Sequence, residues 1–335
     1  MSIVETDAFD LVAQAARHGG AEAAFELLAK RFLQEKNYPA LFEVRLMRKR
    51  RELGLPLLAL DSLEDVPEEK RGPYEQAFID AARETGGLFL AAGDIARAWP
   101  YFRAAGDAAP VAQALEGAAP QEGVDRIIEI AFHERVHARK GFELILAQHG
   151  ICRAITLFHQ YPGRDGRAES LRLLVRTLYG ELAENLRRTI AKREGREIEE
   201  AGVAALIAGR DWLFDDNAYY VDTSHVTSVL SFCLDLEDSE TLRLALEMAD
   251  YGRRLGPVYH YKGEPPFENI FEDYGVYLRA LVGERVEEAV GHFRRKAAAS
   301  DPAQVGYGPA QVLVGLLARL GRYGEIGRAS CRERV

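Results

Sequence analysis

Residues 79–112 read IDAARETGGLFLAAGDIARAWPYFRAAGDAAPVA, and this pattern decides the fold class. Apolar residues recur at helical spacing on both sides of Gly93 and Asp94, a pair typical of a turn, so the stretch predicts two consecutive helices. The small Ala98 suits a point where two paired helices cross, and Phe102 would fill the groove one turn later. Pro110 is expected to end the second helix, because proline cannot continue its hydrogen bonding.

This alternation of small and large residues resembles the tetratricopeptide repeat, in which two helices pack through such positions. The residues that fit the repeat are Gly86, Phe89, Ala98, Phe102, Ala105 and Pro110. Ala82 and Thr85 stand where the repeat has Trp and Leu. Looser similarity occurs at three further places: residues 24–28, Ala289 with Phe293, and residues 317–323. The chain is thus similar to bacterial tetratricopeptide-type proteins, with a good match over one repeat, a partial match over two or three, and none over the middle of the chain.

The resemblance implies an all-α fold, a curved array of helical hairpins that forms a TPR-like α-solenoid. Proteins of this family usually act as scaffolds that bind other proteins or peptides in a groove lined by the first helix of each hairpin. The expected role is therefore protein–protein interaction without a cofactor, in a process that the sequence does not name. A non-repetitive helical bundle with one accidental match is the structural alternative.

Helical periodicity also dominates outside this repeat, and alternating strand patterns of useful length are missing. Apolar residues recur every three or four positions over residues 171–190, which predicts an amphipathic helix ended by Gly195. Ser239 is a good N-cap for another helix, and Gly256 with Pro257 would close it. These patterns extend the all-α prediction to the second half of the chain.

We divide the chain into three segments. Residues 1–120 are expected to form N-terminal hairpins that include the repeat, and residues 121–326 further hairpins with aromatic and acidic loops. Residues 327–335 read GRASCRERV, where the apolar period stops abruptly. They resemble translated adaptor or vector sequence, so we expect a non-native tail, with a basic native C-terminus as the alternative.

Composition narrows the classes of function. The chain has 335 residues and a net charge of −9, and no apolar run approaches the ~20 residues of a membrane span. The acidic balance disfavours binding to nucleic acid, and the basic residues 45–51 are better interpreted as a solvated helix end. The N-terminus lacks the features of a secretory signal, and the three cysteines include no Cys-x-x-Cys pair. We therefore expect a cytoplasmic protein without membrane or nucleic-acid partners.

One motif indicates metal chemistry. His133, Glu134 and His137 form the pattern His-Glu-x-x-His. On a helix the two histidines would face the same side and share a zinc ion, while Glu134 would act as general base on the metal-bound water. Glu143 or His149 is a candidate third ligand. A zinc-dependent hydrolase is therefore the alternative to a scaffold, and two half-exposed histidines near a helix end are the structural interpretation.

Two loops, residues 212–225 and 259–268, combine aromatic and acidic residues at a density unusual for this chain. Loops carried by rigid helices commonly hold binding groups, so we predict a cleft for a peptide or a polar ligand. Its expected lining is Trp212, Tyr219, Tyr220, His225, His260 and Glu264. The structural interpretation is that Thr223 or Ser224 caps a helix and the tyrosines pack their own loop. A noncatalytic sensor of a small ligand is a third role, resting on this cleft alone.

Overall fold

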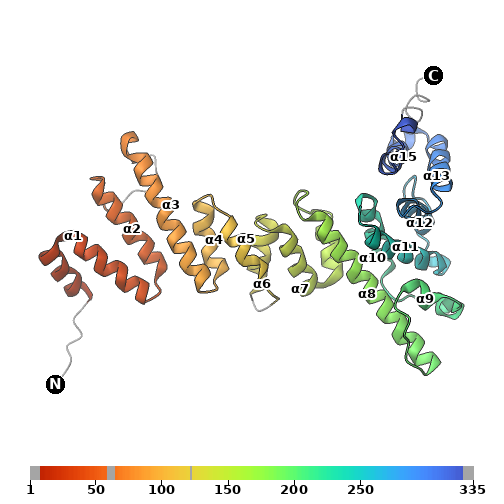
Figure 1. Cartoon of the computed structure of the whole chain (residues 1–335), viewed down its shortest axis with the longest axis horizontal. Helices are drawn as coiled ribbons and strands as arrows, with labels where there is room; N and C mark the ends of the chain where they lie inside the picture. Colours follow the sequence, from red (N-terminus) through yellow and green to blue (C-terminus); the bar gives the residue numbers. More distant parts are fainter. Residues whose placement is uncertain (1–7, 59–64, 121–122, 327–335) are drawn as a thin grey trace. The chain divides into compact units, whose positions relative to one another are not determined.

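The computed structural model describes residues 8–58, 65–120 and 123–326, and these residues are helical with connecting loops (Figure 1). They contain no β-strand, and one isolated antiparallel bridge pairs Lys262 with Asn269. The prediction of an all-α protein is confirmed. Across the described ranges, no helix is long and apolar enough to cross a membrane.

The chain divides into two compact units, residues 1–144 and residues 145–335. The division that the sequence suggested after residue 120 therefore falls inside the first unit. The suspected tail, residues 327–335, lies outside the described residues, and the prediction about it stays a prediction.

In the first unit, each helix from α1 to α4 packs against the next, while α5 and α6 both pack on α4. Its elements are α1 (Ala8–Gln34), α2 (Tyr38–Glu52), α3 (Glu68–Ala91), α4 (Ile95–Ala104), α5 (Ala109–Glu116), α6 (Val124–Ile128) and the π-helical turn η2 (Glu129–His133). Helix α7 (Ala138–Phe158) carries the boundary between the units. Gly150, with a φ of 75°, interrupts the helical geometry of α7.

Helices α3 and α4 form the hairpin predicted from residues 79–112. Gly93 turns the chain with a φ of 78°, a conformation that favours glycine. Asp94 then caps α4 by accepting a hydrogen bond from the backbone N–H of Arg97 at 2.9 Å. Pro110 does not end α4, contrary to the prediction. It lies in the first turn of α5, where its missing N–H costs no helical hydrogen bond.

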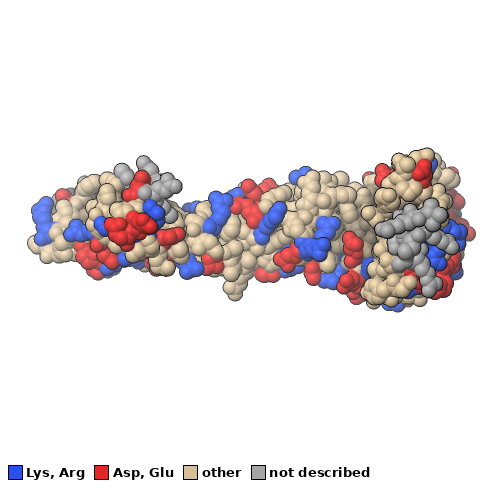
Figure 2. Space-filling model, turned by 90° about the horizontal axis from the view of Figure 1, so that it is seen from above, with Lys and Arg blue, Asp and Glu red and all other residues tan. Residues whose placement is uncertain are grey.

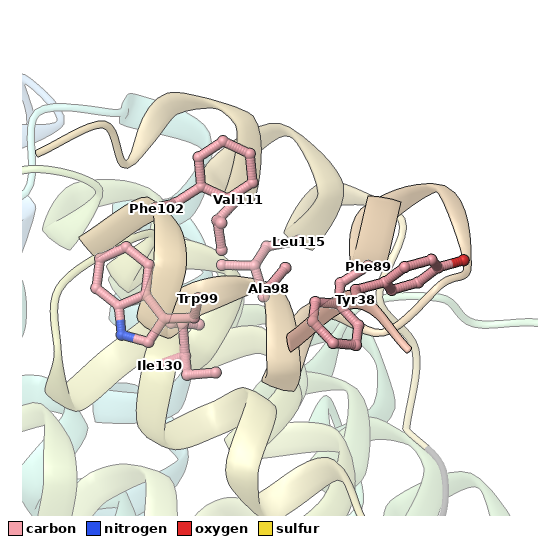
Figure 3. Close-up of a cluster of buried hydrophobic side chains, with 9 residues drawn as sticks. Tyr38, Phe89, Ala98, Trp99, Phe102, Val111, Leu115 and Ile130 are labelled. Carbon is pink, nitrogen blue, oxygen red and sulfur yellow. The ribbon is translucent and has the colours of Figure 1, made fainter. Parts of the chain in front are cut away.

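The contact between the two helices is a large side chain on a glycine. Phe102 is buried, and a Cβ added to Gly86 would lie 2.7 Å from its ring. Ala98 is completely buried one turn before Phe102 on α4. Figure 3 shows the surrounding buried cluster, which includes Tyr38, Phe89, Ala98, Trp99, Phe102, Val111, Leu115 and Ile130. Only glycine at position 86 lets the phenyl ring approach α3 this closely.

The second unit contains the longest uninterrupted helix of the described residues. Its elements are α8 (Arg167–Glu194), α9 (Val203–Ile207), η3 (Asp211–Asn217), α10 (Thr223–Phe232), η4 (Cys233–Asp235), α11 (Ser239–Arg254), η5 (Pro257–Tyr259), α12 (Ile270–Leu281), α13 (Val286–Ala299), α14 (Pro302–Val305) and α15 (Gly308–Arg319). Helix α8 buries the predicted apolar stripe and ends at Gly195 in the left-handed conformation.

Two helix starts differ from the prediction by a residue or two. Asp238, not Ser239, caps α11, and Asp222, not Thr223 or Ser224, caps α10. In both helices an aspartate carboxylate accepts hydrogen bonds from backbone N–H groups of the first turn. A charged carboxylate satisfies these donors and also interacts favourably with the positive end of the helix dipole.

Helices α12, α13 and α15 enclose a core of their own in the second unit. Phe293 is completely buried there, with its ring centroid 5.5 Å from that of Tyr277 and 5.6 Å from that of Phe267. Ala289, one turn earlier on α13, is also buried. This core supports the loop of residues 256–269, which connects α11 to α12 and is called the 256–269 loop below.

Candidate functional site

The His-Glu-x-x-His motif lies at a break between helices. His133 ends η2, Arg135 has a φ of 63°, and α7 begins only at Ala138. The expectation of one continuous helix with both histidines on the same face is therefore wrong. The break allows α7 to pack closely on the preceding turn, where a Cβ added to Gly141 would lie 2.7 Å from Phe132.

The motif's side chains are engaged by other residues of the first unit. Glu134 accepts a hydrogen bond from the indole N–H of Trp99 at 2.6 Å and another from Arg103 at 3.0 Å. The Nε2 atom of His137 lies 2.7 Å from the Glu116 carboxylate, and His133 is exposed. Among residues 8–58, 65–120 and 123–326, no group of three or more His, Cys, Asp and Glu side chains is arranged to hold a metal ion. These contacts do not fit a zinc site, and the hydrolase alternative gains no support from the geometry.

The basic cluster of residues 45–51 belongs to α2 and is largely paired. Arg45 forms a two-point ion pair with Glu84 at 2.7 and 2.8 Å, and Arg48 pairs with Glu22. Arg50 is buried and donates a hydrogen bond to the Tyr74 hydroxyl. On the face seen in Figure 2, basic and acidic side chains lie close to one another over much of the surface. The cluster is therefore largely paired within the first unit, and the buried Arg50 departs from the interpretation of a solvated helix end.

Two of the six predicted binding residues make structural contacts in the second unit. The guanidinium carbon of Arg193 on α8 lies 4.1 Å from the ring centroid of Trp212. Tyr220 donates a hydrogen bond from its hydroxyl to the Leu213 carbonyl and from its backbone N–H to the Tyr251 hydroxyl, each at 2.9 Å. These contacts attach the segment around η3 to α8 and α11.

The other four predicted residues lie at different places in the second unit. Tyr219 is 56% exposed and packs edge-to-face on Tyr259, with ring centroids 5.4 Å apart. His225 lies in the first turn of α10. His260 and Glu264, both on the 256–269 loop, line two separate pockets. Neither pocket is lined by more than one of the six residues.

The first pocket has a volume of about 300 Å³ and lies at the start of α12. Its lining consists of Arg253, His260, Tyr261, Asn269, Ile270, Phe271 and Glu272. Arg253 and Glu272 form an ion pair with each other at 2.6 Å. The pocket's two opposite formal charges are therefore already paired.

The second pocket has a volume of about 400 Å³ and is enclosed by the 256–269 loop, α10, α12 and the start of α15. Its lining consists of Thr227, Ser228 and Ser231 on α10, residues 263–267 of the loop, Ile270 and Tyr274 on α12, and Gly308 and Val312 on α15. The rings of Phe267 and Tyr274 stack with centroids 4.1 Å apart and planes 7° apart. Burial raises the pKa of the Tyr274 phenol to about 12, so this group is protonated at neutral pH. The pocket thus joins apolar and hydroxyl surfaces.

A buried charged network fixes the end of the 256–269 loop. Asp273 on α12 is completely buried and accepts hydrogen bonds from His292 Nε2 at 2.7 Å, Lys296 Nζ at 2.9 Å and the backbone N–H of Asn269 at 2.8 Å. Lys296 also pairs with Glu268. Burial opposes the ionisation of Glu268, but the hydrogen bond from Lys296, a backbone hydrogen bond and the positive charges of Lys296 and Lys262 together outweigh burial and lower the pKa of that carboxyl. A buried carboxylate needs such donors, so this network holds the loop to α12 and α13.

Exposed hydrophobic side chains gather around the same loop. Six large ones are exposed among the described residues of the second unit: Tyr219, Val258, Tyr261, Val305, Tyr307 and Tyr323. Val258 and Tyr261 belong to the loop, and Tyr219 packs against Tyr259 in it. Val305 and Tyr307 immediately precede Gly308, which lines the second pocket. We refer to Tyr219, Val258, Tyr261, Val305 and Tyr307 as the exposed apolar set.

Sequence reasoning missed the residues that α10, α14 and α15 contribute to this region. Val305 ends the four-residue helix α14, and Tyr307 directly precedes α15, so the two residues flank Gly306 at a break between short helical segments. That pattern was the available signal. The hydroxyl residues of α10 gave none, because serine and threonine near a helix start are ordinary.

The comparisons with known proteins add no further identification. No protein-family model, curated protein or solved structure matches this chain.

Proposed function

We propose that this protein binds a segment of another protein at the surface around the 256–269 loop. The observation that carries the proposal is the exposed apolar set, because five large hydrophobic side chains from three segments of the second unit face solvent. Soluble proteins seldom leave such groups together on the surface unless they contact a partner, and tyrosine is enriched in protein interfaces. The two pockets that the loop helps to line provide places for partner side chains.

The rigidity of the loop supports the proposal. The Asp273 network fixes its end, and the stacked Phe267 and Tyr274 rings pack it on α12. A surface that is held in place before binding loses less conformational entropy when the partner arrives. Tyr261, the exposed tyrosine of the loop, is therefore presented by a preorganised support.

We further propose that the first unit is built from TPR-like hairpins, as the sequence resemblance implies. The packing of Phe102 on Gly86 and the contacts between consecutive helices support this idea. The short helices α5 and α6 and the π-helical turn depart from a regular repeat. In this proposal the protein is an interaction scaffold, with one regular hairpin in the first unit and the partner surface in the second.

A peptide selection tests the proposed function. The full chain is immobilised and exposed to a phage library of random peptides, and the selected peptides are titrated against purified variants. A Tyr261→Ser/Tyr307→Ser double variant should bind them at least about tenfold more weakly, because aromatic side chains carry much of the binding energy at interfaces. Tyr323→Ser is the matched control, since Tyr323 is 69% exposed but not part of the exposed apolar set. Failure to enrich any peptide, or equal binding by both variants, contradicts the proposal.

A further inference from the structure

The second pocket has one formal charge at its wall. Glu264 is the only charged residue that lines it, and the Glu264 side chain forms no hydrogen bond or ion pair with any other residue that the structure describes. The first pocket differs, because there Arg253 and Glu272 pair with each other. Lys296, which lies beside the loop, is bound to Glu268 and Asp273. A carboxylate at the mouth of an otherwise uncharged pocket favours a cationic group.

The hydroxyl groups of α10 restrict the partner further. Thr227 and Ser228 both donate to the Ser224 carbonyl, at 3.0 and 2.8 Å, and Ser231 donates to the Ser228 carbonyl at 2.7 Å. Because a carbonyl oxygen only accepts, the proton of each hydroxyl is committed to its own helix. Each hydroxyl oxygen keeps lone pairs that accept hydrogen bonds. This side of the pocket therefore presents acceptors, which suit a group rich in N–H donors.

The remaining wall is apolar and aromatic. Phe267 and Tyr274 contribute stacked rings, and the other apolar lining residues are Pro265, Pro266, Ile270 and Val312. An arginine side chain combines a methylene stem for such a surface with a planar guanidinium that carries five donors. Lysine also carries a positive charge, but its strongly hydrated ammonium has no planar face to lie against an aromatic ring.

We propose that the second pocket binds an arginine side chain of the partner protein. The guanidinium pairs with Glu264 and donates to the hydroxyl oxygens of α10, while the methylene stem packs along Phe267 and Val312. This inference rests on the proposed function and names the chemistry of the partner segment. The net charge of −9 on the chain agrees with a basic partner.

Four bead libraries of heptapeptides test the assignment. The central residue is fixed as arginine, lysine, citrulline or glutamate, and all other positions are random. Fluorescently labelled full-length protein is applied to each library at equal concentration. We expect at least about tenfold more binding to the arginine library than to the citrulline library, since citrulline has nearly the same shape but no charge.

Matched variants then connect this preference to the pocket. Glu264→Gln should remove most of the preference for arginine over citrulline. Glu284→Gln, which changes an exposed glutamate on the turn between α12 and α13, should retain it. Circular dichroism checks that both variants are folded. Both positions are exposed, so neither substitution is expected to disturb the fold.

The outcomes separate the two proposals. Binding to no library overturns the proposed function and this inference together. Equal binding to the arginine and citrulline libraries, or to the arginine and lysine libraries, overturns the arginine assignment and leaves the proposed function standing. A preference for arginine that persists in Glu264→Gln shows that the cation binds elsewhere, which also overturns the inference.

Discussion

Thr85 is completely buried in α3, and its hydroxyl has no hydrogen-bond partner in the structure described here. A buried hydroxyl without a partner is unfavourable because it has given up its hydrogen bonds to water. At Thr85 the packing of the hairpin therefore buries a hydroxyl group without giving it a hydrogen-bond partner among the described residues.

Replacing this hydroxyl by a methyl group should stabilise the protein. Thr85→Val keeps the shape of the side chain and removes the unpaired polar atom, so we expect the free energy of unfolding to rise by about 1 kcal/mol. Urea denaturation followed by circular dichroism measures the change. Thr189→Val is the control, because the Thr189 hydroxyl donates to the Asn185 carbonyl at 2.9 Å and should give no gain. A less stable Thr85→Val variant contradicts the explanation.

At the same scale, some residues were predictable from the sequence and others were not. A local pattern within one hairpin predicted a small residue at Ala98, where the helices cross, and Phe102 in the groove one turn later. The contact of Phe102 with Gly86 was not predicted. Asp273 was not singled out, because its partners His292 and Lys296 lie about twenty residues further along the chain. Only the packing of α13 on α12 brings these charges together.

At the scale of elements, the region between α6 and α7 shows why a motif can mislead. The spacing of His133 and His137 was interpreted on the assumption of a continuous helix. Apolar periodicity does not reveal the π-helical turn or the left-handed Arg135, because both leave the buried residues on the core side. The close approach of Gly141 to Phe132 was a clue only in retrospect, since glycine in a helix serves several purposes.

The ion pairs that Glu116 forms with His137 and Arg139, next to this break, predict how the stability of the protein depends on pH. Glu116, at the end of α5, accepts hydrogen bonds from Arg139 and is paired with His137. The hydrogen bond from Arg139, followed by that from His137, lowers the pKa of Glu116 from 4.5 to about 2. A carboxyl whose pKa is lower in the folded state contributes stability that is present above pH 4.5 and is lost as the pH falls towards 2.

Glu116→Gln should therefore reduce the loss of stability in this pH range. The melting temperature of the wild-type chain should fall more steeply between pH 5 and pH 3 than that of Glu116→Gln, measured by calorimetry at low salt. Glu69→Gln, which alters an exposed glutamate in the first turn of α3, is the control and should follow the wild-type curve. Parallel curves for the wild-type chain and Glu116→Gln would falsify the assigned role of this ion pair.

At the scale of the whole molecule, the sequence predicted the all-α class because helical spacing is a local signal that repeats along the chain. It did not predict the division near residue 144, because that boundary falls within α7 and no loop, proline or change of composition marks it. Both loops predicted to bind a ligand lie in the second unit. The sequence analysis expected their residues to line one cleft, whereas His260 and Glu264 line two separate pockets. Pocket walls come from α10, α12 and α15, which are distant in sequence.

Each unit has its own buried aromatic cluster, and this predicts separable unfolding. Phe102→Ala opens a cavity in the first unit and Phe293→Ala opens one in the second, each at an expected cost of about 3–5 kcal/mol. Hydrogen exchange followed by mass spectrometry, at urea concentrations below the transition, reports on each unit through its own peptides. Phe102→Ala should lower protection in α3 and α4 while α12 and α13 keep theirs, and Phe293→Ala should do the reverse. Equal loss of protection in both units after either substitution would show that the chain unfolds as one cooperative body, in which case a partner bound at the 256–269 loop would stabilise the α3–α4 hairpin as well.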